Sequence, residues 1–409
     1  MTNIKFENNP QSNIPVEEPE DIIFEEDEQE DKRRRLLLLL LLLLLLLLCC
    51  VVGLFYRYLQ NPEPLPEMVP LPVEVNYPPH YLFSFYGVDR PVGVAISPDE
   101  TRIYVTEVGG DRMIKVFDRE GSPINSFTIP RTTPGQRAPV YIDTNSAGRV
   151  FVTDRLQHSI YIFDANGLYI DTILGPDLSL SEYVSKHVGE IEPGVKYTYN
   201  LFEPIVHYQK GNADDLTFPA PDRETWSPLG IYISKDDTMY ITDVTEENNV
   251  VRIFPNDVTR AISLQSFDPP QRMFGSYGQG NGQFLFPNAA IPADDGRIYV
   301  SDGNNGRISV WDSEGNFLFH YGQGSGNGAL SLPRGSTIDG KNRLYVVDAV
   351  GQDVKTYDVS GEQPQFLFSF GEWGLDDGQF NYPNDIVTDS SGRLYIADRE
   401  NNRIQVWSY

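Results

Sequence analysis

The strongest hydrophobic pattern in the chain is a continuous apolar run near its N-terminus. Residues 36–48 are thirteen consecutive leucines, and the run continues through Val51 and Val52 to Phe55. A helix of about 20 residues spans about 30 Å, which matches the hydrocarbon thickness of a bilayer. The pattern predicts one transmembrane helix over residues 36–58. A cleaved signal peptide with a weak cleavage site after the run is the alternative.

Charges beside this run indicate its direction across the membrane. The basic residues 32–35 precede it directly, and Arg57 is the only base just after it. Because basic flanks stay in the cytoplasm, we expect residues 1–35 to form a disordered acidic tail there, ending in the basic cluster. Residues 59–79 are rich in proline and predict a semi-rigid stalk. The cell membrane would then hold residues 80–409 on its extracytoplasmic side as a single-pass protein.

Beyond residue 80, short apolar stretches alternate with turn residues and form a repeat. Each unit opens with proline, passes through an apolar strand and a turn, and reaches a second strand that ends in an acid. A third strand ends in an aromatic residue, and a fourth follows. Four short strands in about 45 residues are typical of a propeller blade. The units open at Pro91, Pro139, Pro228, Pro287, Pro333 and Pro383.

The two ends of this region complement each other. The last unit reaches Tyr409 after its third strand. A match to the missing fourth strand stands at the other end, because residues 81–87 read Tyr-Leu-Phe-Ser-Phe-Tyr-Gly where residues 366–371 read Phe-Leu-Phe-Ser-Phe-Gly. We therefore expect an all-β domain over residues 80–409. Its fold would be a six-bladed β-propeller closed by an N-terminal strand and preceded by one transmembrane α-helix.

The units also resemble a known family, the NHL repeat. An Asn-x-Arg-Ile core stands in residues 401–404, and the same core with one added glycine stands in residues 304–308. The resemblance covers residues 81–409, although the first three units depart from the core. It implies a propeller, but the family includes sensors, scaffolds, RNA binders and lyases, so it leaves the function open.

Composition narrows the set of partners. The 58 acids and 32 bases give a net charge of −26. Such a surface repels phosphate backbones, so we expect no nucleic-acid partner. The two cysteines, Cys49 and Cys50, both lie in the apolar run. The repeat domain therefore has no disulfide and depends on packing for its stability.

Two interpretations are open for the acids that end the second strands. A ring of carboxylates would hold a divalent cation such as calcium in the channel. Alternatively, each acid accepts hydrogen bonds from backbone N–H groups in the following turn, as Asp commonly does. We favour turn capping and expect no cofactor. The acids are Glu107, Asp154, Asp243, Asp302, Asp348 and Asp398.

The residue after each opening proline is expected to line the rim of the central channel. Half of these residues are apolar, and the polar half lies on three adjacent units: Asn288, Arg334 and Asn384. An arginine between two asparagines is a candidate clamp for a carboxylate or a peptide carbonyl. The alternative is a solvated rim that binds no ligand.

A long insertion, residues 175–226, separates the second and third units. It is rich in aromatic residues, and insertions over one face of a rigid scaffold often carry function. We expect a lid or a partner-docking element on the rim side. The alternative is a decoration that packs its aromatic residues on the flank of the propeller. The candidate residues are Tyr197, Tyr199, Phe202, His207, Tyr208 and Trp226.

Two classes of function remain. The first is a membrane-tethered sensor or scaffold whose propeller binds a small ligand or another protein. The second is a metal-dependent propeller enzyme, a lactonase-like hydrolase or a lyase with its site in the channel. The histidines show no recognisable metal-ligand spacing, and no nucleophile–base pair is evident, so we assign no catalytic or metal-binding residue and favour binding. The histidines are His80, His158, His187, His207 and His320.

Overall fold

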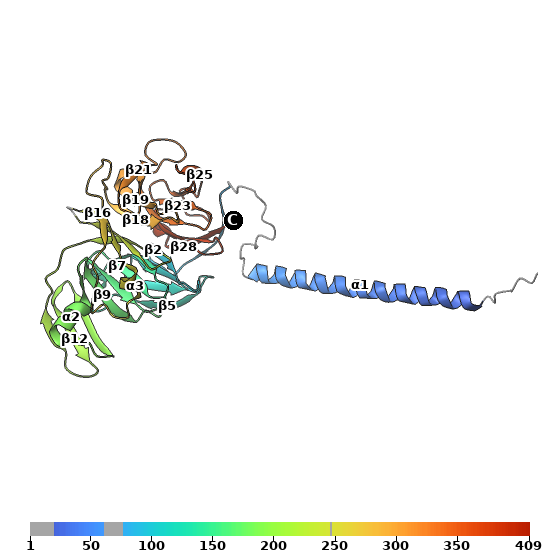
Figure 1. The fold of residues 1–409 in the computed structure, drawn as a ribbon, viewed down its shortest axis with the longest axis horizontal. Coiled ribbons are helices and arrows are strands. Elements are labelled where there is room, and N and C mark those ends of the chain that lie inside the picture. The colour runs from blue at the N-terminus through green and yellow to red at the C-terminus, as the bar shows by residue number, and fades with distance from the viewer. Residues whose placement is uncertain (1–19, 61–76, 246–247) are drawn as a thin grey trace, which may run out of the picture. The chain divides into compact units, whose positions relative to one another are not determined.

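The computed structural model describes residues 20–60, 77–245 and 248–409 (Figure 1). The chain divides into two compact units, residues 1–63 and residues 64–409. The first contains a single described helix, α1 (Glu20–Gln60). Within it, Lys32–Arg57 is long and apolar enough to cross a membrane, with a mean hydropathy of 3.5 and nothing buried. A signal sequence has the same properties.

Helix α1 begins well before the apolar run, at Glu20. Residues 20–35, which we expected to be disordered, are therefore helical. Glu, Gln, Lys and Arg dominate this stretch and are good helix formers. Adding a residue to an existing helix also costs far less than nucleating one. Residues 1–19, and residues 61–76 of the expected stalk, lie outside the described residues.

The second unit consists of antiparallel sheets (Figure 1). Its described residues form six sheets of four or five strands, and the first strand of each begins at one of the six repeat prolines. Proline donates no hydrogen bond and suits the first position of a strand. The first sheet contains β2 (Pro91–Ile96), β3 (Ile103–Glu107), β4 (Ile114–Phe117) and β5 (Pro123–Phe127). The second contains β6 (Pro139–Thr144), β7 (Val150–Asp154), β8 (Ser159–Phe163), β9 (Tyr169–Gly175) and the short β10 (Leu178–Ser179).

The remaining four sheets follow the same order along the chain. The third contains β14 (Pro228–Ile233), β15 (Met239–Val244), β16 (Asn249–Phe254) and β17 (Arg272–Phe274). The fourth contains β18 (Pro287–Pro292), β19 (Ile298–Asp302), β20 (Arg307–Trp311) and β21 (Phe317–Tyr321). The fifth contains β22 (Pro333–Ile338), β23 (Arg343–Asp348), β24 (Asp353–Asp358) and β25 (Gln365–Phe370). The sixth contains β26 (Pro383–Thr388), β27 (Leu394–Asp398), β28 (Arg403–Ser408) and β1 (His80–Phe85).

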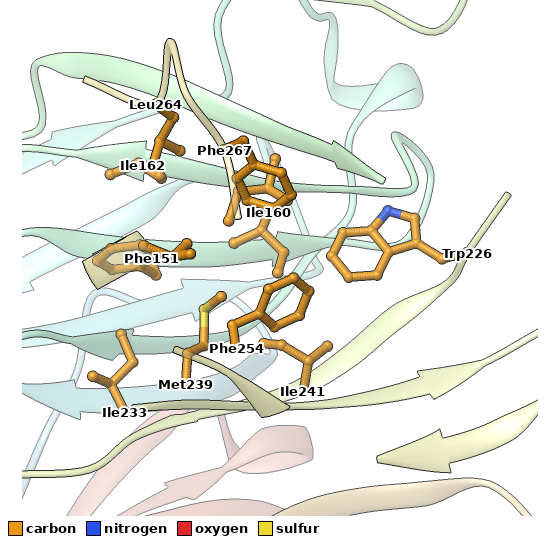
Figure 2. Packing of buried hydrophobic residues seen from close by; sticks show 12 residues of the cluster. Phe151, Ile160, Ile162, Trp226, Ile233, Met239, Ile241, Phe254, Leu264 and Phe267 are labelled. Carbon is orange, nitrogen blue, oxygen red and sulfur yellow. The ribbon is translucent and has the colours of Figure 1, made fainter. Parts of the chain in front are cut away.

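Apolar side chains pack between neighbouring sheets. Figure 2 shows one such layer, in which Phe151 and Ile160 of the second sheet face Met239 and Phe254 of the third. The first strands also contact one another in the order β2, β6, β14, β18, β22 and β26, and β26 contacts β2. Second strands are almost entirely buried, because both of their faces meet other sheets. The fold thus gathers the six first strands around one common space.

Strand β1 belongs to the sixth sheet although it precedes the other strands in the chain. It pairs with β28 in antiparallel fashion, with His80 opposite Ser408 and Phe85 opposite Ile404. The ring of Phe85 lies 5.0 Å from that of Phe117 in the first sheet. Phe85 and Phe117 share an apolar cluster with Tyr395 and Val406 of the sixth sheet. This strand therefore joins the first and last sheets.

The insertion forms a small structure of its own beside β9 (Figure 1). Helix α2 (Leu180–Val188) packs with a three-stranded sheet around a separate apolar cluster. Ser179 caps the helix by accepting a hydrogen bond from the N–H of Glu182 at 3.1 Å. The strands of this sheet are β11 (Val195–Asn200), β12 (Glu203–Lys210) and β13 (Leu216–Pro219). A short helix, α3 (Asn256–Arg260), and three 3₁₀ turns, η1 (Pro134–Gln136), η2 (Gly303–Asn305) and η3 (Arg399–Asn401), complete the described elements.

Replacing the buried ring of β1 tests its structural role. Phe85→Ala should lower the free energy of unfolding by about 3–5 kcal/mol, because it leaves a cavity between the first and sixth sheets. Leu168, in the turn between β8 and β9, is 69% exposed, so Leu168→Ala should change stability by no more than about 0.5 kcal/mol. Denaturant unfolding of the full chain in detergent, followed by tryptophan fluorescence, measures both. Equal effects of the two substitutions would contradict the assigned role of β1.

Candidate functional site

The six acids at the ends of the second strands each bind the backbone of an adjoining loop. Each accepts a hydrogen bond of 2.7–3.0 Å from an N–H in the loop that enters the first strand of its own sheet. Asp302 and Asp398 also pair with Arg307 and Arg403 at 2.8 Å. The predicted capping of the following turn is confirmed for Asp154 and Asp348, which accept from the N–H groups of Gln157 and Gly351 at 2.9 Å. Asp302 and Asp398 accept there from the side chains of Asn305 and Asn401 instead. Within the described part of the chain, no group of three or more His, Cys, Asp or Glu residues is placed to hold a metal ion.

These acids define one end of the sheet assembly, which we call the rim face: the starts of the first strands, the ends of the second strands and the loops between them. Three apolar residues that follow the opening prolines, Val92, Val140 and Leu229, meet there. They form one cluster with Tyr141 and Val244. The apolar half of the predicted rim is therefore packed together and closes that side of the channel mouth.

The polar half of the rim, which we expected to form a clamp from Asn288, Arg334 and Asn384, is only partly assembled. Arg334 donates to Asn288 at 2.8 Å and to the hydroxyl of Tyr382 at 3.4 Å. Asn288 in turn donates to the carbonyl of Phe286 at 2.9 Å. Asn384 is buried and donates instead to the carbonyl of Val92, also at 2.9 Å. The structure thus brings two of the three predicted clamp residues together, and Asn384 serves the contact between the sixth and first sheets.

Two further arginines on this face were missed from sequence. Arg155 follows Asp154 directly and stacks over the ring of Phe286 at 5.2 Å. Arg399 follows Asp398 and stacks over the ring of Tyr382 at 5.4 Å. Burial lowers the pKa of both guanidinium groups, and the nearby charge of Arg334 lowers both pKa values further. Both arginines directly follow an acid that ends a second strand, and this shared position is the feature of the sequence that could have identified them.

Below the mouth, the first strands enclose a narrow cavity of about 60 Å³, lined by residues of all six. Small-molecule pockets measure roughly 300–1,000 Å³, so this space suits water or a single ion. Two buried carboxyl groups line it. Burial raises the pKa of Asp143 to about 7, and burial together with the charge of Asp143 raises that of Asp385 to about 8. Asp143 accepts from the N–H of Ile233, and Asp385 from the N–H of Val94.

A second hollow, of about 320 Å³, lies at the opposite ends of the first strands. The cross-strand pair Tyr232 and Tyr240 lines it, together with the acids Asp236, Asp294 and Asp339. Asp236 and Asp339 already accept hydrogen bonds from their own turns. We therefore locate the candidate site on the rim face.

The aromatic residues of the insertion do not form one exposed binding surface. Trp226 is 1% exposed, and Figure 2 shows it in the layer between the second and third sheets. Tyr199 and Tyr208 lie in the insertion's own core, whose margin includes Tyr197. The remaining two candidate residues of the insertion, His207 and Phe202, lie outside this core. His207 bonds to Asp215 at 2.7 Å, and Phe202 is 52% exposed.

The sheets and repeats define the class of protein, and comparisons with known proteins agree with it. Residues 380–407 match the family model of the NHL repeat. Protein brain tumor of Drosophila melanogaster is 28% identical over 165 residues, which cover 37% of this chain and 15% of that protein. NHL repeat-containing protein 3 of Homo sapiens is 33% identical over 70 residues, which cover 17% of this chain and 20% of that protein. These matches support an NHL-type β-propeller, and they span only a small part of each relative.

Solved structures show a more distant likeness. A streptogramin B lyase structure covers 80% of this chain and 97% of its own, with a TM-score of 0.48 and 13% identity. A chain of the mitotic checkpoint complex covers 85% of this chain and 96% of its own, with a TM-score of 0.49 and 11% identity. Likeness at this level carries no argument about activity.

The buried carboxyl of Asp385 predicts a pH-dependent stability. Between about pH 4 and pH 8 the unfolded chain ionises this group while the folded chain keeps it protonated. Folding then takes up a proton, so stability falls as pH rises, by at most about 1.4 kcal/mol per pH unit. Asp385→Asn removes this contribution, and its free energy of unfolding should fall less than that of the wild type between pH 5 and pH 8.

Denaturant unfolding at several pH values measures this slope. Asp143 contributes in the same direction, so the variant should reduce the slope without abolishing it. Asp268→Asn changes an exposed carboxylate and serves as the control. A slope in Asp385→Asn equal to that of the wild type would show that the group is ionised in the folded protein.

Proposed function

We propose that this chain is a single-pass membrane protein whose extracytoplasmic NHL-type propeller has six blades, is closed by β1, and binds another protein through its rim face. In this proposal α1 crosses the cell membrane with its N-terminus in the cytoplasm. The propeller acts as a sensor or scaffold by binding rather than by catalysis. Separate observations support its closure, its tether and its binding face.

Contacts between the ends of the sheet series support a closed ring. β26 contacts β2, and the amide of Asn384 donates across this junction to Val92. The fourth strand of the sixth sheet is β1, so the edge of β28 is paired. Covering such edges prevents association through unpaired strands.

The exposed leucines support the membrane tether. Residues 36–48 are each at least 55% exposed in α1. A fully apolar helix surface of this length is stable in hydrocarbon but costly in water. The bases at 32–35 favour an N-terminus in the cytoplasm.

Exposed aromatic residues on the rim face are the observation that carries the binding proposal. Tyr277 and Trp373 occupy equivalent places in two glycine-rich loops and are 55% and 69% exposed. Asn305 and Arg307 hold the first loop by donating to its carbonyls. Their counterparts Asn401 and Arg403 hold the second loop in the same way.

Rigidly supported tyrosine and tryptophan are the residues that most often dominate protein–protein binding energy, together with arginine. Both loops border the mouth that contains Arg334. Leu375, 68% exposed, lies close to Trp373 along the second loop. The rim face therefore combines aromatic, apolar and cationic groups on an immobile backbone.

Membrane topology can be tested in whole cells with tags at both ends of the chain. We expect the full-length chain to stay in the membrane after alkaline carbonate extraction. External protease should remove the C-terminal tag and spare the N-terminal one. Release of a shorter chain that lacks the N-terminal tag would instead establish cleavage as a signal peptide.

Partner binding can be tested with matched surface substitutions. We expect the double variant Tyr277→Ser, Trp373→Ser to recover at least tenfold less of a specific cell-surface protein than the wild-type chain in detergent, by quantitative mass spectrometry. Leu168→Ser removes a residue that is 69% exposed in the β8–β9 turn and should leave recovery unchanged. An unchanged set of proteins for the double variant would reject the rim face as the binding surface.

A further inference from the structure

Six residues on the rim face form one continuous series of contacts, which we call the rim arc. Arg155 stacks on Phe286, and the carbonyl of Phe286 accepts from Asn288. Asn288 accepts from Arg334. The series continues through the hydroxyl of Tyr382, which accepts from Arg334, to Arg399, which stacks on the Tyr382 ring. The arc thus holds three guanidinium groups in fixed positions at the channel mouth.

The contacts leave hydrogen-bonding capacity on these arginines. The guanidinium carbons of Arg155 and Arg399 lie over aromatic rings, which accept no conventional hydrogen bond from them. The Nε of Arg334 is buried and has no hydrogen-bond partner among the described residues. Within the same residues, no carboxylate forms an ion pair with Arg155 or Arg334. An unpaired buried donor is costly, and a bound acceptor would remove that cost.

Electrostatics point to an anionic ligand. Burial lowers the pKa values of Arg155 and Arg399; the charge of Arg334 lowers both further, and that of Arg90 lowers the pKa of Arg399, so these cations repel one another. Glu400, 3.5 Å from Arg399 and 2.9 Å from Arg90, offsets part of this charge at one end of the arc only. A local group of cations at the mouth attracts an anion, although the chain as a whole carries a net charge of −26. The strongly negative chain also repels polyanions, which favours a ligand with one or two charges.

We propose that the rim arc binds a carboxylate group, with Arg334 as the central fork and Arg155 and Arg399 on either side. A guanidinium fork matches the two oxygens of a carboxylate. The cavity below the mouth measures only about 60 Å³, so the rest of the ligand lies above the rim, over the loops of Tyr277 and Trp373. This inference rests on the proposed binding function and assigns the group recognised there. The carboxylate belongs either to a small free acid or to the C-terminus of a polypeptide.

Titration calorimetry on the full chain in detergent tests the site and separates the two sources. The probes are succinate, inorganic phosphate, and a glycine–alanine hexapeptide with either a free or an amidated C-terminus. We expect the free-carboxylate peptide or succinate to bind. The amidated peptide should not bind, and phosphate should bind at least tenfold more weakly than the best carboxylate. No binding of any carboxylate, or equal binding of the free and amidated peptides without succinate binding, would overturn the proposal.

Charge variants locate the bound group. Arg334→Met should weaken carboxylate binding at least tenfold, and Arg155→Met several-fold, because each removes a charged donor. Arg155 is exposed, although its guanidinium is shielded by Phe286, and its side chain donates no hydrogen bond within the described chain, so its removal should leave the fold intact even if Arg334→Met does not. Lys196→Met removes one exposed charge from β11 and is the control. Equal affinities for Arg155→Met, Arg334→Met and the control would overturn the site.

The two proposals fail independently in this design. If the arginine variants lose carboxylate binding, and substitution of Tyr277 and Trp373 abolishes recovery of the protein partner, both proposals stand. If carboxylate binding is absent but partner recovery depends on Tyr277 and Trp373, the rim arc is rejected and the binding face stands. If the carboxylate binds and partner recovery is indifferent to the aromatic pair, the rim arc stands and protein binding by this face is rejected.

Discussion

The hydrogen bond from a strand-ending acid to the loop beside it determines the geometry of the rim face. Each acid is buried and satisfies its oxygens by binding this loop, and in several sheets also the following turn or an arginine of the third strand. Asp398 shows the full arrangement, since it accepts from the N–H of Asn381 and from the side chains of Asn401 and Arg403. Burying such a carboxylate is costly without partners and tolerable with them. The residues next to these acids and loops, Arg399 and Tyr382 among them, are positioned as a consequence.

Much of this arrangement can be predicted from the sequence, because it depends on residue types, proline and aspartate, that occur at only a few kinds of position in a sheet protein. Proline opens each first strand, and an acid ends each second strand, in the structure as in the repeat. The direction of the residue after each proline could not be derived. Every first strand has an irregular register directly after its proline, for example between Pro383 and Asp385. A bulge breaks the alternation of side chains, so the repeat does not determine where the next side chain points. Asn384 is directed to the carbonyl of Val92 in the first sheet.

The insertion illustrates a different limit. The sequence alone does not distinguish a tryptophan that covers a face from one that packs in a core, and Trp226 packs in the core. Arg155 and Arg399 were overlooked for another reason. They occupy one repeat position, but the other four units place Val108, Val244, Gly303 and Ala349 there, so the position shows no shared chemistry. Their role depends on rings brought near by folding, which a single unit does not reveal. The length of α1 was underestimated because helix formers beside a strong helix extend it.

The pairing of β1 with β28 also sets the order in which the six sheets are completed during synthesis. β1 is the first strand of the domain to be made, and its partner is the last, since His80 lies opposite Ser408. The ribosome therefore completes five sheets before the sixth has all its strands. Throughout that interval the apolar side chains of β1 have no native neighbour and depend on chaperones or the translocation machinery for protection. The sixth sheet is complete only when both β1 and β28 are present, so a chain truncated before β28 is recognisable by an unpaired first strand.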